Sequence, residues 1–275
     1  MDEEVNRPAH PGVIRDSGES QRWVPAVAAM SGKLARQILD LVLPPTCPIT
    51  GESVEKPGYL SAKGWAAIRF IDDPVCARCG VPFASDYGEG FECAACIAEP
   101  PSFDRARAAV VYDDASRKLI VGFKHSDRTE LGPLLGQWLA RAGGPLIRTG
   151  TIIIPAPLHP RRLLARRFNQ AGLLASVLAE KLGARVLLDG LKRVRATPPQ
   201  QGLSRSARRE NVGGAFAVNE ERRVAFGGGE ILLNDDVLTT GETLSACARA
   251  LKKAGAVAVD ALVLARTVRG GLDAL

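Results

Sequence analysis

One short segment near the C-terminal end constrains the fold more than any other part of the sequence. Residues 231–243 read ILLNDDVLTTGET, in which an apolar run is followed by two acids and then by small hydroxyl residues around a glycine. From Thr243 onward, apolar residues recur at helical spacing. The pattern predicts a strand that ends at Asn234, then a loop, then a helix.

The predicted loop has the composition of an anion-binding site. Small side chains and Gly241 let the backbone come close to a phosphate, and the N-terminus of the following helix adds partial positive charge. Asp235 and Asp236 would repel that phosphate unless they meet hydroxyl donors or a metal ion. A ribose 5-phosphate satisfies both conditions. The alternative is an ordinary strand-to-helix turn with Thr240 or Thr243 as the helix N-cap.

Four cysteines in two pairs predict a metal site. The sequence contains Cys76-x-x-Cys79 and Cys93-x-x-Cys96, and thirteen residues separate the pairs. Two such pairs can close a tetrahedral four-sulfur zinc site in a small zinc ribbon. Disulfide pairing is the competing interpretation, and the absence of any sign of secretion disfavours it.

A weaker echo of this pattern lies just upstream. Cys47 and Thr50 parallel the first cysteine pair, and Ser61 and Gly64 stand three apart where a second pair is expected. Because only one of these four side chains binds zinc usefully, this half is predicted to be free of metal and held by apolar contacts. The expected packing residues are Leu60, Trp65, Ile68 and Phe70.

The whole chain divides into three predicted parts. Residues 1–22 are polar without periodicity and predict a disordered leader, and residues 23–99 predict a helix followed by the ribbon with one intact zinc site. Residues 100–275 alternate strands with helices, which predicts a mostly parallel sheet covered on both faces, with ligands at the carboxyl ends of its strands. The expected strands are 106–112, 151–155, 215–218, 231–234 and 256–265, and the expected helices are 24–43, 116–123, 130–142, 168–182 and the segment from Thr243. Cys247, inside the last helix, is expected to be a small buried apolar residue.

Charge and hydropathy bound the partners of the chain. No run approaches the roughly 18 apolar residues of a membrane span, and the first residues lack the features of a secretory signal, so a cytoplasmic location is expected. The net charge is +6, but residues 159–211 hold twelve Lys or Arg against three acids. Such a cluster favours an anionic partner, either a polyphosphate ligand or a nucleic acid. A solvated basic surface is the alternative.

Two basic stretches in this region are candidate ligand contacts. After the strand at 151–155, a proline-stiffened loop leads to arginines at the head of a helix, which predicts a second anion-facing turn. Residues 196–210 lack strong periodicity and predict a flexible lid. The candidate residues are Arg161, Arg162 and Arg167 in the turn, and Arg193, Arg195, Gln200, Gln201 and Arg208 in or beside the lid.

Taken together, the chain resembles the ComF family along residues 43–268. The motifs that carry the resemblance, in addition to the ribbon cysteines, are PPSFDRARAAVVY, FKH, PLHPRR with RRFNQ, RVRATPPQQGLSR, ENVGGAF and NDDVLTTGET. In that family a zinc ribbon precedes a type I phosphoribosyltransferase domain, and members are associated with the uptake of single-stranded DNA. The sequence departs from the family at Arg166-Arg167, where Arg-Gly is usual, and in the cysteines lost upstream.

The resemblance implies a phosphoribosyltransferase-like fold that binds phosphoribosyl pyrophosphate with Mg²⁺. It implies roles for Asp235 and Asp236 at the ribose and metal-bound water, for Thr239, Thr240, Gly241, Glu242 and Thr243 at the 5-phosphate, and for Arg161, Arg162 and Arg167 at the pyrophosphate. Apart from the resemblance, Lys124-His125 is a candidate acid or base for the acceptor, with a structural role as the alternative. No acceptor is specified by the sequence. The alternative function is a non-catalytic adaptor that binds phosphoribosyl pyrophosphate, single-stranded DNA or DNA-uptake proteins.

Overall fold

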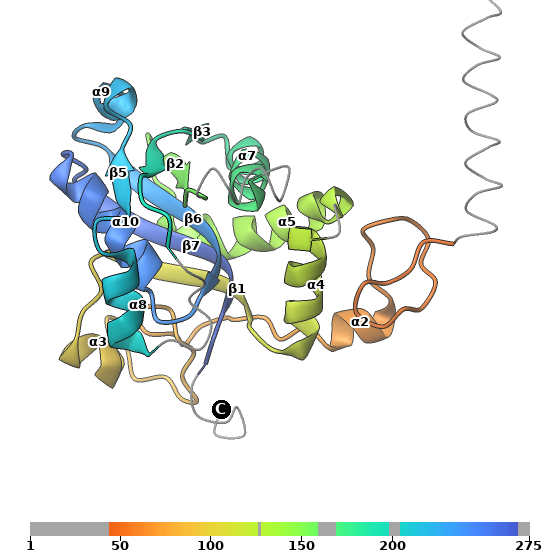
Figure 1. Ribbon diagram of the computed structural model, residues 1–275. Helices are drawn as coiled ribbons and strands as arrows, with labels where there is room; N and C mark the ends of the chain where they lie inside the picture. The colour runs from red at the N-terminus through yellow and green to blue at the C-terminus, as the bar shows by residue number, and fades with distance from the viewer. Residues whose placement is uncertain (1–43, 126–127, 159–168, 198–203, 269–275) are drawn as a thin grey trace, which may run out of the picture. The chain divides into compact units, whose positions relative to one another are not determined.

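The computed structural model describes residues 44–125, 128–158, 169–197 and 204–268. The described residues from Thr46 onward belong to one compact unit (Figure 1). The predicted leader at 1–22 and the whole of the predicted helix at 24–43 lie outside the described residues. None of the helices in the described ranges has the length and apolar character that crossing a membrane requires.

A five-stranded sheet forms the centre of this unit. Its strand order is β1-β7-β6-β2-β3, and each neighbouring pair is parallel. The strands are β1 (Ala106–Val111), β2 (Ile152–Pro155), β3 (Arg185–Val186), β6 (Glu230–Leu238) and β7 (Ala258–Arg266). The mostly parallel sheet predicted from the sequence is therefore confirmed. The expected strand at 215–218 is not part of it, because β5 (Phe216–Val218) pairs antiparallel with β4 (Leu191–Arg193) in a separate two-stranded sheet.

Helices bury both faces of the parallel sheet, which explains why its strands read as continuous apolar runs. Along β2, Ile152 and Ile154 pack into one apolar cluster while Ile153 packs into the other. The second cluster contains residues of α4 (Asp114–His125), α5 (Gly132–Gly143) and α7 (Gln170–Leu182). The first contains residues of α10 (Glu242–Lys253), α8 (Arg205–Val212) and both strands of the small sheet (Figure 1). Cys247 of α10 is fully buried in that cluster, as predicted.

Strand β6 is longer than the sequence predicts. It continues past Asn234 to Leu238, because β7 supplies backbone partners as far as the pairing of Leu238 with Arg266. The prediction that the strand ends at Asn234 is wrong, since this pairing outweighs the low strand propensity of the two acids. Asn234 itself is fully buried, and its Nδ2 donates a hydrogen bond to the carbonyl of Leu262 at 3.2 Å.

The expected lid also contains regular structure. Helix α8 begins inside the segment 196–210, and the Ser204 hydroxyl caps it by accepting a hydrogen bond from the Ala207 amide at 3.2 Å. The last part of this segment is therefore helical, and its role as a lid stays a prediction. A serine N-cap before a short helix was the local signal in the sequence.

The segment between the two halves of the ribbon extends the sheet at its β1 edge. Phe70 forms an antiparallel bridge with Val110, and the Ile71 amide donates to the Ala109 carbonyl at 3.0 Å. The pairing covers backbone groups of β1 on the side away from β7. The ribbon and the sheet therefore share one hydrogen-bonded edge.

Candidate functional site

The strand order locates the place where a ligand is expected. In the sheet, β3 lies on one side of β2, whereas β6 and then β7 lie on its other side. The strand order therefore reverses between β2 and β6. In open parallel sheets, ligands bind outside the carboxyl ends of the strands at such a reversal of order. The acids of β6 and the loop that follows them lie at this end of the sheet.

The two acids of β6 have different surroundings. Asp236 Oδ2 lies 2.6 Å from Lys124 Nζ, which comes from the last turn of α4 on the face covered by α5 and α7. Burial, and then the charge of Asp236, raise the pKa of Asp235 to about 7, although the Asp236 amide donates to Asp235 Oδ1 at 2.9 Å. The pair thus combines one carboxylate that a lysine neutralises with one that takes up a proton near neutral pH.

The sequence named Lys124 and His125 as a candidate acid or base. The structure places Lys124 against an acid of β6, and His125 is the last residue of α4. A lysine paired in this way supplies positive charge beside the acids rather than a free general base.

The loop after β6 has the backbone geometry of an anion site. Gly241 is the N-cap of α10 and adopts φ = 81°, in the left-handed region that favours glycine. A Cβ at this position would also lie 3.4 Å from Phe103 and from Leu238. The alternative interpretation had Thr240 or Thr243 as the N-cap, and the structure has Gly241 there instead. Gly241 offers no capping side chain, and a helix N-terminus that begins in this way is suited to bind an anion.

Two arginines of α8 reach this loop. Arg208 Nη1 donates to Thr239 Oγ1 at 3.1 Å. Arg209 lies 3.5 Å from the carboxylate of Glu242, which is only 3% exposed, and 2.5 Å from that of Glu99. The positive charge of Arg209 therefore offsets the negative charge of Glu242 in the ligand-free protein. The sequence pointed to Arg208 and missed Arg209, its neighbour on the same helix.

The other expected lid residues have local partners. Arg193 lies in β4, donates to Thr197 and stacks over the Phe216 ring with 5.2 Å to the centroid. Arg195 Nη2 donates to the carbonyls of Asn211 and Gly213 at 3.0 and 2.7 Å. These contacts tie the segments on either side of the lid together. The remaining candidates, Arg161, Arg162, Arg167, Gln200 and Gln201, lie outside the described residues.

The four paired cysteines converge into one cluster. Their sulfur atoms all lie within 4.8 Å of one another, and Cys79 and Cys93 are 3.6 Å apart. With Zn–S distances of roughly 2.3 Å, tetrahedral zinc places sulfurs just under 4 Å apart, so the donor set and its spacing fit a structural Zn²⁺. Gly80 brings this cluster onto the sheet, because a Cβ there would lie 2.5 Å from the Ala106 carbonyl of β1.

The upstream half of the ribbon also converges, around hydrogen bonds. Thr50 Oγ1 and Ser61 Oγ lie 3.0 Å apart, and a Cβ at Gly64 would lie 2.7 Å from Cys47 Sγ. The four positions of the sequence echo are therefore neighbours in space. Only one of these four side chains is a thiol, so a half free of metal stays the prediction for this part of the ribbon.

The apolar contacts expected in this half are present in part. Leu60 and Ile68 are buried, and Trp65 stacks on Phe70 with ring centroids 6.1 Å apart. Trp65 is nonetheless 43% exposed, so it covers the core from outside rather than filling it.

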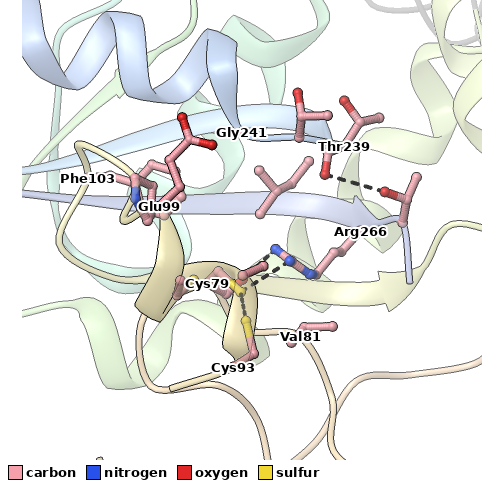
Figure 2. A pocket seen from close by; sticks show the side chains of 14 residues that line it. Cys79, Val81, Cys93, Glu99, Phe103, Thr239, Gly241 and Arg266 are labelled. Carbon is pink, nitrogen blue, oxygen red and sulfur yellow. Dashed lines mark hydrogen bonds between the residues drawn. The ribbon is translucent and has the colours of Figure 1, made fainter. Parts of the chain in front are cut away.

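A cavity of about 230 Å³ opens between the intact zinc ribbon and the loop after β6 (Figure 2). Val81, Ala95 and Glu99 line it from the ribbon side, and Phe103, Thr239 and Thr267 line it from the sheet side. Arg266, at the carboxyl end of β7, joins the two sides. Its Nη1 donates to the Cys79 carbonyl at 2.5 Å, and its Nη2 lies 3.2 Å from Cys79 Sγ.

The cavity was not predicted from the sequence, although one residue of the sequence points to it. Arg266 is the one charged residue that ends the apolar run of β7, at the edge of the sheet where ligands bind.

Sequence comparison shows relatives over most of the chain. Residues 38–97 match the double zinc ribbon domain. The "DNA utilization protein YhgH" of Escherichia coli is 31% identical over 202 residues, which are 72% of this chain and 86% of that protein. The "Competence protein F" of Haemophilus influenzae is 32% identical over 198 residues, 70% of this chain and 85% of that protein.

Comparison with solved structures gives weaker similarities. An allosteric regulatory enzyme of purine biosynthesis matches 48% of this chain and 25% of its own length, with 20% identity and a TM-score of 0.32. A hypoxanthine phosphoribosyltransferase from Staphylococcus aureus matches 49% of this chain and 72% of its own length, with 10% identity and a TM-score of 0.33. The strand order establishes the fold.

Proposed function

This chain belongs to the ComF family, and on that premise we propose that it binds phosphoribosyl pyrophosphate with Mg²⁺ and transfers the phosphoribosyl group to an acceptor. Residues 100–275 would form the phosphoribosyltransferase-like domain, and the ribbon before them would hold one structural zinc. The proposed site lies outside the carboxyl ends of β2 and β6.

One observation carries this proposal. Two adjacent carboxylates near the end of β6 are followed by a threonine-containing loop. The glycine of this loop, Gly241, has φ = 81° and is the N-cap of α10. Carboxylates accept hydrogen bonds from ribose hydroxyls and attract a cation, whereas the helix N-terminus binds a phosphate. A ribose 5-phosphate presents both kinds of group at the spacing of one sugar ring. Asp235, Asp236 and the Thr239–Thr243 loop are the residues we assign to it.

The metal ion and the arginines of the proposed site would neutralise the negative charge of the phosphate groups. When bound, Mg²⁺ would neutralise the charge that develops on the departing pyrophosphate, and the acids of β6 are suitable ligands for the ion or its waters. Arg161, Arg162 and Arg167 are proposed to hold the pyrophosphate. Arg208 is proposed to hold the loop over the 5-phosphate, an assignment supported by its hydrogen bond to Thr239. Little covalent chemistry is asked of the protein beyond this positioning.

A second candidate function is an adaptor in DNA uptake. The names of the relatives, "DNA utilization protein" and "Competence protein F", favour a role of this kind. The excess of basic residues over 159–211 would suit a nucleic-acid backbone. In that case the same site would bind phosphoribosyl pyrophosphate without transferring it.

The proposal is tested by ligand-induced stabilisation. Phosphoribosyl pyrophosphate with Mg²⁺ should raise the melting temperature of the wild-type protein, and the double variant Asp235→Ala/Asp236→Ala should lose that shift. A matched control is Asp189→Ala/Glu220→Ala, which removes two acids that pair with surface arginines. A shift that survives in the first variant would place the ligand elsewhere.

The enzyme and the adaptor are separated by a second measurement. Arg167→Ala should lower turnover more than ligand affinity if the arginine stabilises the departing pyrophosphate. In an adaptor, the same change should instead weaken binding of single-stranded DNA and flatten its salt dependence by about one unit.

A further inference from the structure

Arg266 lies between the zinc ribbon and the loop that is proposed to hold the 5-phosphate. It is the last residue of β7, and its guanidinium points at Cys79 in the first cysteine pair of the ribbon (Figure 2). Nη1 donates to the Cys79 carbonyl at 2.5 Å, and Nη2 lies 3.2 Å from Cys79 Sγ. Nε is buried and has no hydrogen-bond partner among the described residues. Cys79 therefore supplies the contacts that fix this guanidinium.

The cysteine cluster gives this arginine an electrostatic role. Four thiolates around one Zn²⁺ carry a net charge of about −2, and Cys76, Cys79 and Cys96 are buried. A buried negative charge is costly unless a positive group or a hydrogen-bond donor lies beside it. Arg266 offers both at Cys79 Sγ. Loss of a hydrogen-bond donor to a metal ligand typically costs about 10–100-fold in metal affinity, so Arg266 is expected to increase the retention of zinc.

The backbone around Arg266 also holds the start of the proposed 5-phosphate loop. Arg266 is the partner of Leu238 in the register of β6 and β7. The Thr267 amide donates to the Leu238 carbonyl at 3.0 Å, and Thr267 Oγ1 donates to the Thr239 carbonyl at 3.5 Å. Displacement of Arg266 would therefore disturb the residues with which the loop begins.

A second arginine joins the ribbon to the loop by a different route. Arg209 is paired with Glu99, at the end of α3 (Ala94–Ala98), and lies 3.5 Å from Glu242, the first residue of α10. Its partners are carboxylates, whereas Arg266 contacts a cysteine of the metal cluster. A change at the zinc site would therefore act on Arg266 directly.

From these contacts we infer that Arg266 is a positioning residue that links the zinc site to the 5-phosphate loop, so that zinc and a phosphoribosyl ligand each favour the binding of the other. Zinc fixes Cys79, Cys79 fixes the guanidinium of Arg266, and the end of β7 holds the loop. Such linkage is reciprocal, so a ligand at the loop must increase the affinity for zinc by the same factor by which zinc increases the affinity for that ligand. The inference rests on the proposed function.

The rate of zinc release tests this linkage in the full-length, zinc-loaded protein. The protein is mixed with an excess of the coloured chelator pyridylazoresorcinol, with and without saturating phosphoribosyl pyrophosphate and Mg²⁺. The melting-temperature shift shows in each case whether the ligand is bound. Wild type is compared with Arg266→Met, and with Arg266→Lys in case the methionine variant does not retain zinc during purification. The lysine keeps the charge but loses the planar, two-pronged contact.

Arg107→Met is the matched control. Arg107 also donates from the sheet to the segment of the first cysteine pair, since its Nη1 lies 3.2 Å from the Ala77 carbonyl. It lies in β1, however, and its hydrogen bonds go to backbone carbonyls and not to a sulfur. The variant therefore weakens the attachment of the ribbon to the sheet without touching the proposed link.

We expect the ligand to slow zinc release from the wild type by about fivefold. It should not slow release from Asp235→Ala/Asp236→Ala, and this result would exclude an effect of the ligand on zinc in solution. Arg266→Met should release zinc about tenfold faster than wild type, at the same rate with and without ligand, while keeping a melting-temperature shift. Arg107→Met should keep the fivefold ratio.

Three results would overturn the inference. The first is a wild type that shows the shift but releases zinc at one rate with and without ligand. The second is a fivefold ratio that survives in the Arg266 variant, because the linkage would then run through Arg209 or through unfolding of the whole chain. The third is loss of the ratio in Arg107→Met. A wild type without the shift would instead overturn the proposed function, and this inference with it.

Discussion

Lys124 Nζ and Asp236 Oδ2 lie 2.6 Å apart, and this ion pair joins the end of α4 to the carboxyl end of β6. The two side chains are 19% and 21% exposed, so solvent screens the pair only in part. The lysine offsets the charge of adjacent acids at the place where we propose that Mg²⁺ acts. Binding of the metal complex would then replace one cation by another beside Asp236.

Removal of the lysine tests how much this pair stabilises the protein. We expect Lys124→Met to lower the free energy of unfolding by about 1–3 kcal/mol, because it leaves a half-buried carboxylate without its charged donor. Urea unfolding of Lys124→Met, Asp236→Asn and the double variant gives the coupling energy of the pair. Additive effects in the double variant would show that the two side chains do not stabilise one another.

The pKa of Asp235 predicts a pH dependence of stability in the ligand-free protein. Its pKa rises from 3.8 to about 7 on folding, so between these values the folded chain keeps a proton that the unfolded chain has released. Raising the pH through this window therefore favours the unfolded state. The contribution of the protonated Asp235 to the free energy of unfolding is complete below pH 3.8 and is lost as the pH rises to about 7. We expect Asp235→Asn to remove this contribution and to unfold at a higher urea concentration than wild type at pH 8. A Glu230→Gln variant, at the other end of β6, controls for the loss of a single acid.

Arg208 is expected to stabilise the ligand-binding form of the loop after β6. Arg208→Ala should weaken binding of phosphoribosyl pyrophosphate with Mg²⁺ by about tenfold, equivalent to roughly 1.4 kcal/mol, because the loop loses the hydrogen bond to Thr239. Isothermal titration measures the affinity. Arg222→Ala, which breaks a surface pair with Asp189, should bind as wild type does. Equal affinities of the two variants would exclude a role for Arg208 in the site.

We expect one half of the ribbon to bind zinc and the other half not to bind it. Elemental analysis should find about one zinc per chain, lost in Cys79→Ser and kept in Cys47→Ser, because four sulfurs converge in one half and one in the other. Two zincs in the wild type, or a mapped disulfide between Cys79 and Cys93, would contradict the assignment.

Much of the fold follows from local sequence pattern. The apolar runs at 106–111 and 152–155 are strands because both faces of the sheet are buried, and burial on both faces is what a continuous apolar run predicts. The cysteine spacing likewise predicts the metal cluster, since a zinc site needs nothing beyond its own short knuckles. In both cases the determining contacts lie close in sequence or repeat with a simple period.

The parts that the sequence did not predict depend on distant partners. The carboxyl half of β6 is a strand only because β7 lies beside it as far as Arg266. The pairing of Lys124 with Asp236 joins residues more than one hundred positions apart. The cavity needs the ribbon, β7 and the loop after β6 together, so no single segment of the sequence contains it.

The bridge between Phe70 and Val110 has a practical consequence for dissecting this protein. A fragment that begins near residue 100 would retain every strand of the parallel sheet but would leave β1 as an open edge. Such an edge exposes unpaired backbone groups that recruit strands from other chains, so the fragment would aggregate. Because the fragment also lacks the zinc ribbon, its aggregation could be wrongly attributed to the loss of zinc. A shortened protein that starts before Arg69 keeps the edge covered, because the Arg69 carbonyl accepts from the Val111 amide at 2.8 Å.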